Sequence, residues 1–566
     1  MELSNKEGVR LIVNTLAELG LRHVVICPGS RNAPFVISFN RQSGFQCYSI
    51  RDERSAGFFA LGLAIETQQP VAILCTSGSA TVNFAPAITE AYYQRIPLIV
   101  LTTDRPEIWV DQGDGQTIRQ QGIYNNFIRK SYVLKGDAEN DDEFWYNSRC
   151  LSEGFAIATL SDPGPVHFNI PLHEPLYNMV EAIDKKIRIF LQKPILSQLP
   201  IETEVAMAST LSQSKKVMIL VGQYSDRDGL PELLIGMNAH PQIVVLTETL
   251  SNMHHPSFIG AIDRCITGLT DQEIGELMPD ILITIGDAIV SKRIKSALRK
   301  FKPTEHWNIH PFDSTTDTFQ SLTQAVSLSP AVFFQQINHH VASNNSGYQK
   351  KWKDLDERRK NRHRWFVNRC EYSDLYVFNR IFSVLNEGSN LHIANSSAVR
   401  YAQLFDDSYR VRMHCNRGTS GIEGCTSTAM GAAAAFVDKP HILITGDVAF
   451  HYDINGLWND NFEGKLKIIV INNGGGGIFR IIEGPNKVQE RRTFIETAMT
   501  TNAEKIAEHF QWKYSRVTDA ASLGDALDGF LKEDVQKTIL EICTHPDENP
   551  LILEQYWKYL NEEKVL

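Results

Sequence analysis

The stretch TGDVAFHYDINGLWNDNFEGKLKIIVINNGGGGIF, Thr445–Phe479, indicates the fold of this chain most directly. The apolar run Ile442–Ile444 comes just before it and leads to Asp447, and a second apolar run, Ile468–Ile471, leads to Asn473 and four glycines. Two buried parallel strands that end in polar residues bring those residues together at the carboxyl edge of a sheet, where open α/β folds bind ligands. The stretch therefore predicts a parallel sheet with a ligand site at this edge.

The chemistry of these strand ends favours a magnesium ion and a phosphate-bearing ligand. Asp447 offers a carboxylate, Asn473 an amide carbonyl and the glycines backbone carbonyls, and all are hard oxygen ligands suited to Mg²⁺. Glycines also let the backbone approach a bulky anion closely, which a Cβ would prevent. Gly-Asp followed after about two dozen residues by Asn-Asn is the pattern of thiamine-diphosphate enzymes, although either half alone is typical of a simple turn. One departure from that pattern is Val448, where glycine is usual.

Composition limits the class of protein. With 566 residues the chain should form several domains, because single cores stop growing at roughly 250–300 residues. No apolar run approaches the ~20 residues that cross a bilayer, and the N-terminus has the pattern of an amphipathic helix, not of a signal peptide. A net charge of −10 argues against nucleic acid as a partner. The nine cysteines are odd in number and include no C-x-x-C, which favours reduced thiols in a cytoplasmic protein over a disulfide framework or a zinc site.

Strand and helix patterns alternate along the chain. Apolar strands at Val71–Cys75, Val217–Val221 and Ile281–Ile285, each followed by a polar or glycine-containing turn, predict parallel sheets with helices on both faces. Pro194 and Pro200 discourage helix and mark a linker. We therefore expect an α/β protein with three doubly wound parallel-sheet domains, at 1–184, 201–345 and 346–566, with the linker at 185–200.

The third unit repeats the first. Glu53 and Glu423 each begin a helix, Pro70 and Pro440 each precede a strand, and Ser77 and Asp447 each follow it; every pair is 370 residues apart. Any two βαβ units share some local pattern, but three equal offsets favour an internal duplication. We expect the outer domains to share one topology, with the metal carboxylate in the third domain only. Such a pair suits a cofactor that spans two domains.

Six longer motifs resemble the 2-succinyl-5-enolpyruvyl-6-hydroxy-3-cyclohexene-1-carboxylate synthases, a family of thiamine-diphosphate enzymes in menaquinone biosynthesis. The motifs are PGSRNAPF at Pro28–Phe35, RDERSAGFFALGLA at Arg51–Ala64, TSGSATVNFAPAITEA at Thr76–Ala91, TDRP at Thr103–Pro106, NRGTSGIEG at Asn416–Gly424 and NNGGGGIF at Asn472–Phe479. The resemblance covers both outer domains and reaches the middle one chiefly through SKR at Ser291–Arg293. It implies that the first domain binds the pyrimidine and the third the diphosphate and metal. It further implies a homodimer or dimer of dimers with active sites between the first domain of one subunit and the third domain of its partner.

The implied reaction joins two anions. The family decarboxylates 2-oxoglutarate and adds the resulting carbanion to isochorismate, which gives the product in the family's name and CO₂. The implied cofactors are thiamine diphosphate and Mg²⁺, with Mn²⁺ as an acceptable substitute. The cofactor supplies the electron sink, and the protein supplies position and electrostatics.

The resemblance makes Glu53 the catalytic residue, which hydrogen-bonds the aminopyrimidine and favours the imino form that removes the thiazolium proton. We expect Phe58 and Phe59 to desolvate its carboxyl group. On the residues alone, a first-turn glutamate favoured by the helix dipole is the simpler interpretation. The implied cofactor-binding residues are Glu53, Thr76, Ser77, Gly78, Ile422, Gly446, Asp447, Val448, Asn473, Gly475, Gly476, Ile478 and Phe479, with Asp447, Asn473 and the Gly475 carbonyl as metal ligands.

Substrates with several carboxylates need local cations, and arginine binds carboxylate through two parallel hydrogen bonds. By resemblance, Ser396, Arg400 and Arg417 would hold the part derived from 2-oxoglutarate, and Phe479 would contact cofactor or substrate. The residues that would face isochorismate are Ser30, Arg31, Arg105, Gln116, Lys292 and Arg293. A lone arginine is more often a surface charge, and this applies most to Arg293.

Three other functions compete with this one. Another thiamine-diphosphate 2-oxoacid decarboxylase or an acetolactate-type synthase would share the cofactor residues but act on less charged substrates. A non-catalytic binding module would be favoured by loss of Glu53 or Asp447, and both residues are present. A flavin enzyme is not expected, because no G-x-G-x-x-G follows a strand of the middle unit.

Overall fold

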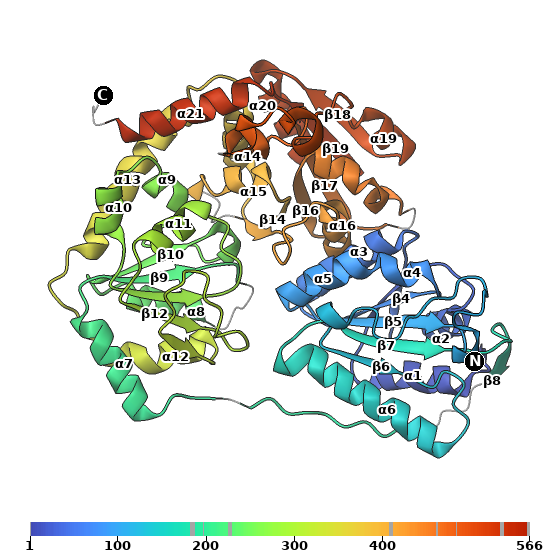
Figure 1. Ribbon diagram of the computed structural model, residues 1–566. Helices are drawn as coiled ribbons and strands as arrows, with labels where there is room; N and C mark the ends of the chain where they lie inside the picture. The colour runs from blue at the N-terminus through green and yellow to red at the C-terminus, as the bar shows by residue number, and fades with distance from the viewer. Residues whose placement is uncertain are drawn as a thin grey trace.

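The protein consists of three parallel β-sheets covered by helices (Figure 1). The computed structural model describes residues 2–181, 187–195, 197–224, 229–406, 411–459, 462–482, 484–532 and 537–562. The first domain (blue to cyan) and the third (orange to red) lie against each other, and the middle domain (green) lies beside them (Figure 1). The predicted α/β class with three parallel sheets is confirmed.

The first domain contains a six-stranded sheet in the order β3-β2-β4-β5-β7-β6. Its central strands β4 and β5 are fully buried, because helices cover both faces. The amphipathic helix expected at the N-terminus is α1, which buries Val9, Ile12 and Leu16. The elements are β2 His23–Ile26, β3 Gln46–Ser49, β4 Val71–Cys75, β5 Leu98–Asp104, β6 Lys130–Val133, β7 Val166–Pro171, α1 Glu7–Glu18, α2 Ala33–Arg41, α3 Glu53–Thr67, α4 Ser79–Asn83, α5 Ala85–Gln94 and α6 Asp141–Ala156, with an antiparallel pair, β1 Glu2–Ser4 and β8 Met179–Glu181, outside the sheet.

The middle domain contains a five-stranded parallel sheet in the order β10-β9-β11-β12-β13. In Figure 1 the chain reaches it from the first domain through an extended segment that includes residues 187–195. The proposed domain boundary at 184 and 185 lies outside the described residues. The elements are β9 Val217–Val221, β10 Ile243–Thr247, β11 Ile281–Ile285, β12 Glu305–Ile309, β13 Gln324–Val326, α7 Ile201–Gln213, α8 Leu230–Met237, α9 Ile262–Ile266, α10 Asp271–Leu277, α11 Lys292–Lys300 and α12 Pro330–Ile337.

The third domain contains a six-stranded sheet in the order β15-β14-β16-β17-β19-β18. The charged segment before it forms α13, but this helix buries Trp352 and Leu355, so it is less solvated than its charge suggests. The elements are β14 Asn390–Ile393, β15 Arg412–His414, β16 Pro440–Gly446, β17 Lys465–Asn472, β18 Lys513–Val517, β19 Lys537–Cys543, α13 Tyr348–Val367, α14 Asp374–Val384, α15 Ser397–Ala402, α16 Cys425–Ala435, α17 Asp447–Tyr452, α18 Ile478–Ile481, α19 Glu504–His509, α20 Ala520–Lys532 and α21 Glu548–Asn561.

The first and third sheets share one strand order, which confirms the repeat that the equal offsets predicted. Reading both sheets from the same edge, β4 and β16 occupy the same place, as do β2 and β14. Ser77 therefore follows the strand that corresponds to the one before Asp447. The two sheets thus share one plan but carry different polar residues after the corresponding strands.

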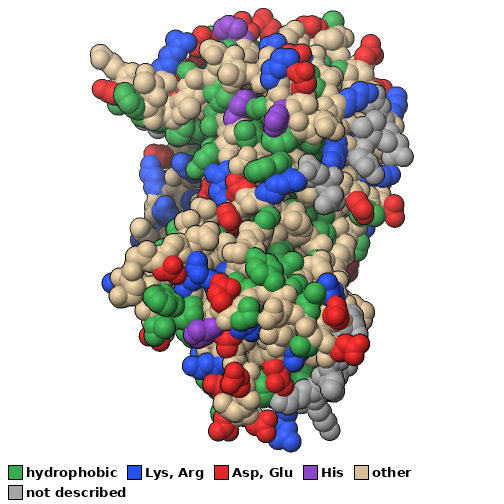
Figure 2. All heavy atoms as spheres, turned by 90° about the vertical axis from the view of Figure 1, so that its right-hand side faces the viewer, with side chains coloured by type: hydrophobic (Ala, Val, Ile, Leu, Met, Phe, Trp, Pro, Cys, Tyr) green, Lys and Arg blue, Asp and Glu red, His purple; other side chains and the backbone are tan. Residues whose placement is uncertain are grey.

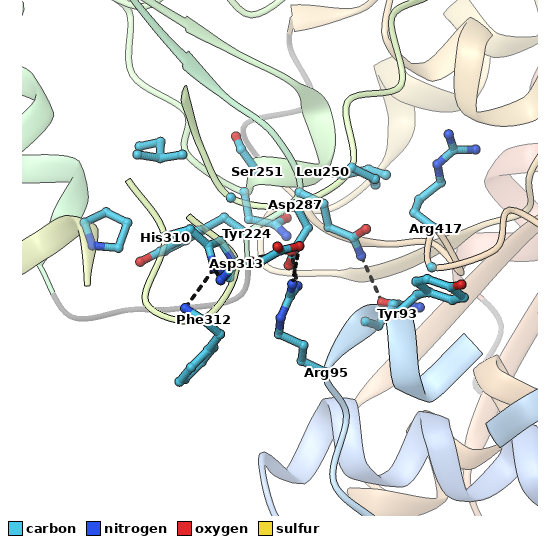
Figure 3. Close-up of a pocket in the computed structure, with 18 of the residues that line it drawn as sticks. Tyr93, Arg95, Tyr224, Leu250, Ser251, Asp287, His310, Phe312, Asp313 and Arg417 are labelled. Carbon is cyan, nitrogen blue, oxygen red and sulfur yellow. Dashed lines mark hydrogen bonds and ion pairs between the residues drawn. The ribbon is translucent and has the colours of Figure 1, made fainter. Parts of the chain in front are cut away.

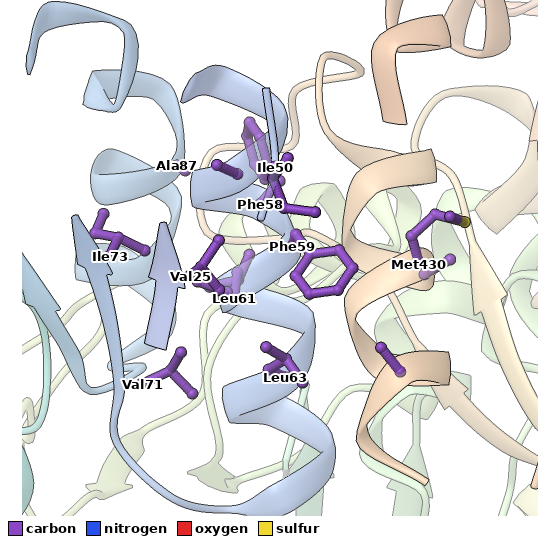
Figure 4. Close-up of a cluster of buried hydrophobic side chains, with 14 of the residues drawn as sticks. Val25, Ile50, Phe58, Phe59, Leu61, Leu63, Val71, Ile73, Ala87 and Met430 are labelled. Carbon is purple, nitrogen blue, oxygen red and sulfur yellow. The ribbon is translucent and has the colours of Figure 1, made fainter. Parts of the chain in front are cut away.

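The outer domains meet through α3 and α16. A Cβ at Gly62 of α3 would lie 1.9 Å from the backbone oxygen of Thr428, and a Cβ at Gly431 of α16 would lie 1.9 Å from that of Phe59. The backbones of the two helices therefore touch at these glycines, where any side chain would prevent such close packing. Figure 4 shows Phe59 of α3 and Met430 of α16 in one buried cluster that joins the two domains. No described helix is both long enough and apolar enough to cross a lipid bilayer.

Candidate active site

The strand ends that the sequence singled out lie together in the third domain. β16 and β17 are paired in parallel, so Asp447 and Asn473 follow neighbouring strands at one edge. The Asp447 carboxylate accepts a hydrogen bond from the Gly475 amide at 2.7 Å and another from the Val448 amide at 2.8 Å. Gly475 adopts φ +125°, a conformation that L side chains rarely adopt. The glycine run thereby folds back over the aspartate.

Two residues that the sequence did not single out, Asp374 and Arg480, hold the Asn473 segment. Asp374 accepts a hydrogen bond from the Asn473 side-chain amide at 2.8 Å and one from the Thr544 hydroxyl at 2.6 Å. Since this uses the amide nitrogen of Asn473, its side-chain oxygen remains available as a ligand. Arg480 donates to the backbone oxygens of Asn473 at 2.7 Å and of Gly474 at 3.1 Å. Arg480 is itself paired with the buried Glu496.

The electrostatics of Asp447 fit a divalent cation. The residue is 2% exposed, and it forms no ion pair within the described part of the chain. Burial raises its pKa to about 6, and the amides of Gly475 and Val448 oppose that shift. Gly446 beside it has open space where a Cβ would stand. A buried carboxylate without an ion-pair partner among the described residues, beside an amide oxygen and glycine carbonyls, matches the oxygen donors that magnesium takes. The described residues contain no cluster of His, Cys, Asp or Glu of the kind that binds zinc.

Three other predicted cofactor residues of the third domain lie on segments next to this group. Ile422 packs near Ala449 of α17, and Ile478 begins α18 and is buried. Phe479 lies against Gly476, where an added Cβ would come 3.1 Å from its ring. His451 contacts the backbone oxygen of Asp447 through its Nδ1, at 2.9 Å.

Glu53 lies at the carboxyl edge of the first sheet. It is the first residue of α3, whose N-cap Asp52 accepts a hydrogen bond from the Ser55 amide at 3.0 Å. Its carboxylate is half-buried, and Asn83 donates to it at 3.4 Å. Its negative charge adds to the burial that raises the pKa of Cys75 at the end of β4. No hydrogen bond or ion pair of the described residues joins Glu53 to Asp447 or Asn473, although the neighbouring Arg54 donates to the backbone oxygen of Tyr452 in α17 at 2.8 Å.

Phe58 and Phe59 lie in the core between the outer domains. A Cβ at Gly424 would come 2.1 Å from the Phe58 ring, and Phe59 packs against Tyr48 with ring centroids 5.4 Å apart. Desolvation of Glu53 by these two rings stays a prediction.

Thr76 and Gly78 follow β4 at the carboxyl edge of the first sheet, the edge at which Glu53 lies. The Gly78 amide donates to Gln120 at 2.8 Å, and a Cβ there would come 3.1 Å from the backbone of Gln116. The Thr76 hydroxyl accepts from the Arg31 amide at 3.3 Å. The predicted residues Ser30, Arg31, Thr76, Ser77, Gly78, Arg105 and Gln116 therefore gather around one sheet edge.

Arg31 and Arg105 are neighbours in this group. The buried Arg31 pairs with Glu174 at 3.0 Å, and Arg105 lies 3.5 Å from Asp114. Burial lowers the pKa of Arg31, and the charge of Arg105 lowers it further. Two cations held close together favour a substrate with negative charge.

A second group of cations contains residues of both the middle and the third domain. Arg400 donates to the backbone oxygen of Ser396 at 2.6 Å, and its pKa is lowered by burial and then by Arg417. Arg293 and Arg400 both oppose the rise that burial causes in the pKa of Asp263. Burial lowers the pKa of Lys295, and the charges of Arg417 and Lys292 lower it further. The sequence did not single out Lys295. Lys292 and Arg293 thus lie with the third-domain arginines, whereas Arg31 and Arg105 lie in the first domain.

A cavity of ≈ 1530 Å³ lies where the three domains meet (Figure 3). Residues from each domain line it, including Arg95, Asp287 and Arg417. Arg95 forms ion pairs with Asp287 and with Asp313, the latter at 3.0 Å, which link the first and middle domains. Glu53, Asp447 and Asn473 do not line this cavity, whereas the predicted substrate residue Arg417 does.

Comparison with known proteins points to one group of enzymes. Models of the thiamine pyrophosphate enzyme family match both outer domains: the N-terminal TPP binding domain at residues 6–123 and the C-terminal TPP binding domain at residues 396–542. A Flavobacterium johnsoniae protein named 2-succinyl-5-enolpyruvyl-6-hydroxy-3-cyclohexene-1-carboxylate synthase is 42% identical over 97% of this chain and 98% of its own length. Proteins of the same name from Flavobacterium psychrophilum and Porphyromonas gingivalis are 41% and 36% identical, over 96% and 99% of this chain and 96% and 98% of their own lengths.

Proposed function

Since this chain belongs to the family of 2-succinyl-5-enolpyruvyl-6-hydroxy-3-cyclohexene-1-carboxylate synthases, we propose that it is a transferase of menaquinone biosynthesis that joins 2-oxoglutarate to isochorismate. The overall change releases CO₂ and forms one carbon–carbon bond. Thiamine diphosphate, when bound, supplies the electron sink that this loss of CO₂ requires. The single observation that carries the proposal is the pairing of Asp447 with the Gly475 amide beside Asn473, on the sheet that repeats the sheet of Glu53.

The third domain would hold the diphosphate end. Asp447, the side-chain oxygen of Asn473 and the Gly475 carbonyl would bind Mg²⁺, or Mn²⁺ in its place, and the glycine backbone would approach the phosphates. Ile422, Gly446, Val448, Gly476, Ile478 and Phe479 would surround the cofactor. Asp374 would keep the Asn473 oxygen turned toward the metal, because it accepts from the amide nitrogen.

The first domain would hold the reactive head. Glu53 would accept and return a proton at its carboxylate, which requires a partner within hydrogen-bond reach. Its half-buried position at the start of α3 leaves that carboxylate accessible from outside its own chain. Thr76, Ser77 and Gly78 would line the same edge.

Two groups of cations would bind the substrate carboxylates. Ser396, Arg400 and Arg417 would hold 2-oxoglutarate. Isochorismate would meet Ser30, Arg31, Arg105 and Gln116 from the first domain, and Lys292 and Arg293 from the second cation group. These two groups would face each other in an assembled site.

We propose a homodimer, or a dimer of dimers, in which Glu53 of one chain meets Asp447 of another. Exposed apolar side chains near the first-domain edge support this, such as Ile108 at 72% and Trp109 at 50% exposure. Figure 2 shows the side on which the outer domains meet, with hydrophobic side chains gathered across its middle. The nine cysteines are all free thiols, which supports a cytoplasmic location.

The test is the product formed with each substrate. The purified chain with thiamine diphosphate and Mg²⁺ should release CO₂ from 2-oxoglutarate, and isochorismate should give the named product by mass. Preference for pyruvate over 2-oxoglutarate would favour an acetolactate-type synthase or another decarboxylase. Thermal stabilisation by the cofactor without turnover would favour a binding module.

Co-expression of two inactive chains tests the shared site. In a mixed dimer of Glu53→Gln and Asp447→Ala chains, one site would carry both changes and the other would carry neither. With random pairing, about one quarter of wild-type activity should return. No recovery, with mixed dimers present by mass, would contradict a site shared between chains.

A further inference from the structure

A first-domain glutamate holds the third-domain loop that carries Arg417. Glu90 of α5 is 1% exposed, and its carboxylate accepts hydrogen bonds from the amide of Gly418 at 2.8 Å and the amide of Thr419 at 2.6 Å. The Thr419 hydroxyl donates to the same carboxylate at 2.6 Å. A Cβ at Gly418 would lie 2.6 Å from the backbone oxygen of Glu90, so the loop rests directly on α5.

The other side of this loop is held within the third domain by Asn395. Its amide nitrogen donates to the backbone oxygens of Asn416 at 2.6 Å and Gly421 at 2.7 Å. Its oxygen accepts from Nη1 of Arg417 at 2.9 Å. Asn395 therefore holds the loop from within the third domain, and Glu90 holds it from the first domain.

Arg417 keeps donors available for a ligand. Its Nε is buried and has no hydrogen-bond partner among the described residues, and the side chain lines the cavity at the junction of the domains. Figure 3 shows Arg417 beside Tyr93 of α5, the helix that also carries Glu90. Guanidinium binds carboxylate best when both of its parallel donors are aimed, so the loop conformation governs how well Arg417 binds.

The same glutamate connects all three domains. Gln94 of α5 donates to Glu90 at 2.5 Å, and Gln223 of the middle domain donates to Gln94 at 3.0 Å. Gln223 also reaches the backbone oxygen of Cys415 at 3.4 Å, two residues before Arg417. The position of the Arg417 loop is thus set from both neighbouring domains.

We propose that Glu90 is a positioning residue that aims Arg417 at the carboxylate of the 2-oxo acid substrate. This inference rests on the proposed function, in which Arg417 binds 2-oxoglutarate. Glu90 acts through the loop and touches neither substrate nor cofactor.

Glu90→Gln tests the inference with little change in shape. An amide offers one acceptor oxygen, and its nitrogen would face amide donors, so the loop would lose part of its support. We expect the KM for 2-oxoglutarate to rise about 10- to 100-fold, while the KM for isochorismate and the affinity for thiamine diphosphate stay within about threefold of wild type. Thr419→Val removes one of the three loop donors to Glu90 and should give a smaller rise in the KM for 2-oxoglutarate. Thr419→Ser keeps the hydroxyl and should have a KM close to that of the wild type.

Glu66→Gln is the matched control. Glu66 is another buried first-domain glutamate that contacts the third domain, because Asn390 donates to it at 3.4 Å. Asn390 is the first residue of β14, so this contact lies at the opposite end of the strand from the site. We expect it to lower the melting temperature without a selective change in the KM for 2-oxoglutarate. Equal rises for both substrates in Glu90→Gln would show a merely structural role and overturn the inference.

A double-mutant cycle separates this inference from the proposed function. If Glu90 acts through Arg417, Glu90→Gln should add no further rise in KM once Arg417 has become alanine. Additive effects would overturn the positioning role. An unchanged KM in Arg417→Ala itself, with an active wild type, would instead overturn the role of Arg417. If Glu90→Gln does not fold, the cycle with Thr419→Val decides.

Discussion

Replacement of Asp374 by alanine would remove two hydrogen-bond acceptors from buried donors. Asp374 is 2% exposed, and its two oxygens accept from the Asn473 amide at 2.8 Å and the Thr544 hydroxyl at 2.6 Å. Without the carboxylate, nothing fixes which end of the Asn473 amide points toward the proposed metal. The substitution therefore affects both metal affinity and stability, and the Asn473 amide contributes to each.

The magnitudes follow from these contacts. Loss of a partner that orients a metal ligand typically weakens metal binding about 10- to 100-fold, so we expect the apparent Kd for Mg²⁺ to rise by that factor. Each buried donor left without a partner costs about 1–3 kcal/mol, which predicts a loss of roughly 2–6 kcal/mol in the free energy of unfolding. Asp374→Asn should be milder for the metal, because its oxygen can still accept from Asn473 while its nitrogen faces a hydroxyl that can also accept.

Calorimetric titration of Mg²⁺ into the protein with thiamine diphosphate would measure the Kd, and urea unfolding the stability. Asp104→Ala is the matched control, since this buried first-domain aspartate accepts from the Asn169 amide at 2.8 Å in the same way. It should lose stability without weakening Mg²⁺ binding. An unchanged Mg²⁺ affinity in folded Asp374→Ala would refute the reasoning that Asn473 is a ligand oriented by Asp374.

Three further predictions address the proton relay, the domain junction and acid stability. Glu53→Gln should bind thiamine diphosphate normally in titration but lose most turnover, because an amide cannot exchange the proton. Gly431→Ala should lower the free energy of unfolding by about 1–3 kcal/mol or more, because its Cβ would stand 1.9 Å from a backbone oxygen of Phe59. Burial lowers the pKa of His167 from 6.5 to about 3, so below pH 6.5 the unfolded chain gains a proton that the folded chain lacks. His167 should then contribute a loss of about 1.4 kcal/mol of stability per pH unit down to about pH 3, and His167→Gln should reduce the slope by that amount in urea titrations across that range.

Each of these predictions has a control or a contradicting result. Near wild-type turnover in Glu53→Gln would exclude the proton relay. Gly529→Ala in α20, where the new Cβ meets nothing within 4 Å, should instead stabilise the protein by about 1 kcal/mol. An acid slope that His167→Gln leaves unchanged would contradict the contribution assigned to His167.

The sequence predicted the sheets because their strands are short apolar runs with polar ends. It also predicted the duplication, since equal spacing survives where two copies keep the same elements. Asp447 and Asn473 could be found because each directly follows such a strand. The expected position of Ser77 at the corresponding edge came from the repeat, and the role expected of Glu53 came from the resemblance to the family.

The supporting residues could not be found in this way. Asp374 lies 99 residues from Asn473, and Glu90 lies 328 residues from Gly418, so no local pattern connects them. Asp374 is the first residue of α14 and Glu90 lies in the middle of α5. Acidic residues are common at such positions and do not by themselves indicate a function. The joining of Lys292 and Arg293 with Arg400 likewise depends on how two domains dock, which spacing along a chain does not encode.

The crossing of α3 and α16 restricts how this chain can be recombined with a relative. Since Gly62 accommodates the backbone of one helix and Gly431 that of the other, the two glycines form a matched pair across the junction. A chimera that takes one outer domain from a homologue with a larger residue at either position would force the helices apart. Grafting should therefore succeed only when both positions keep glycine.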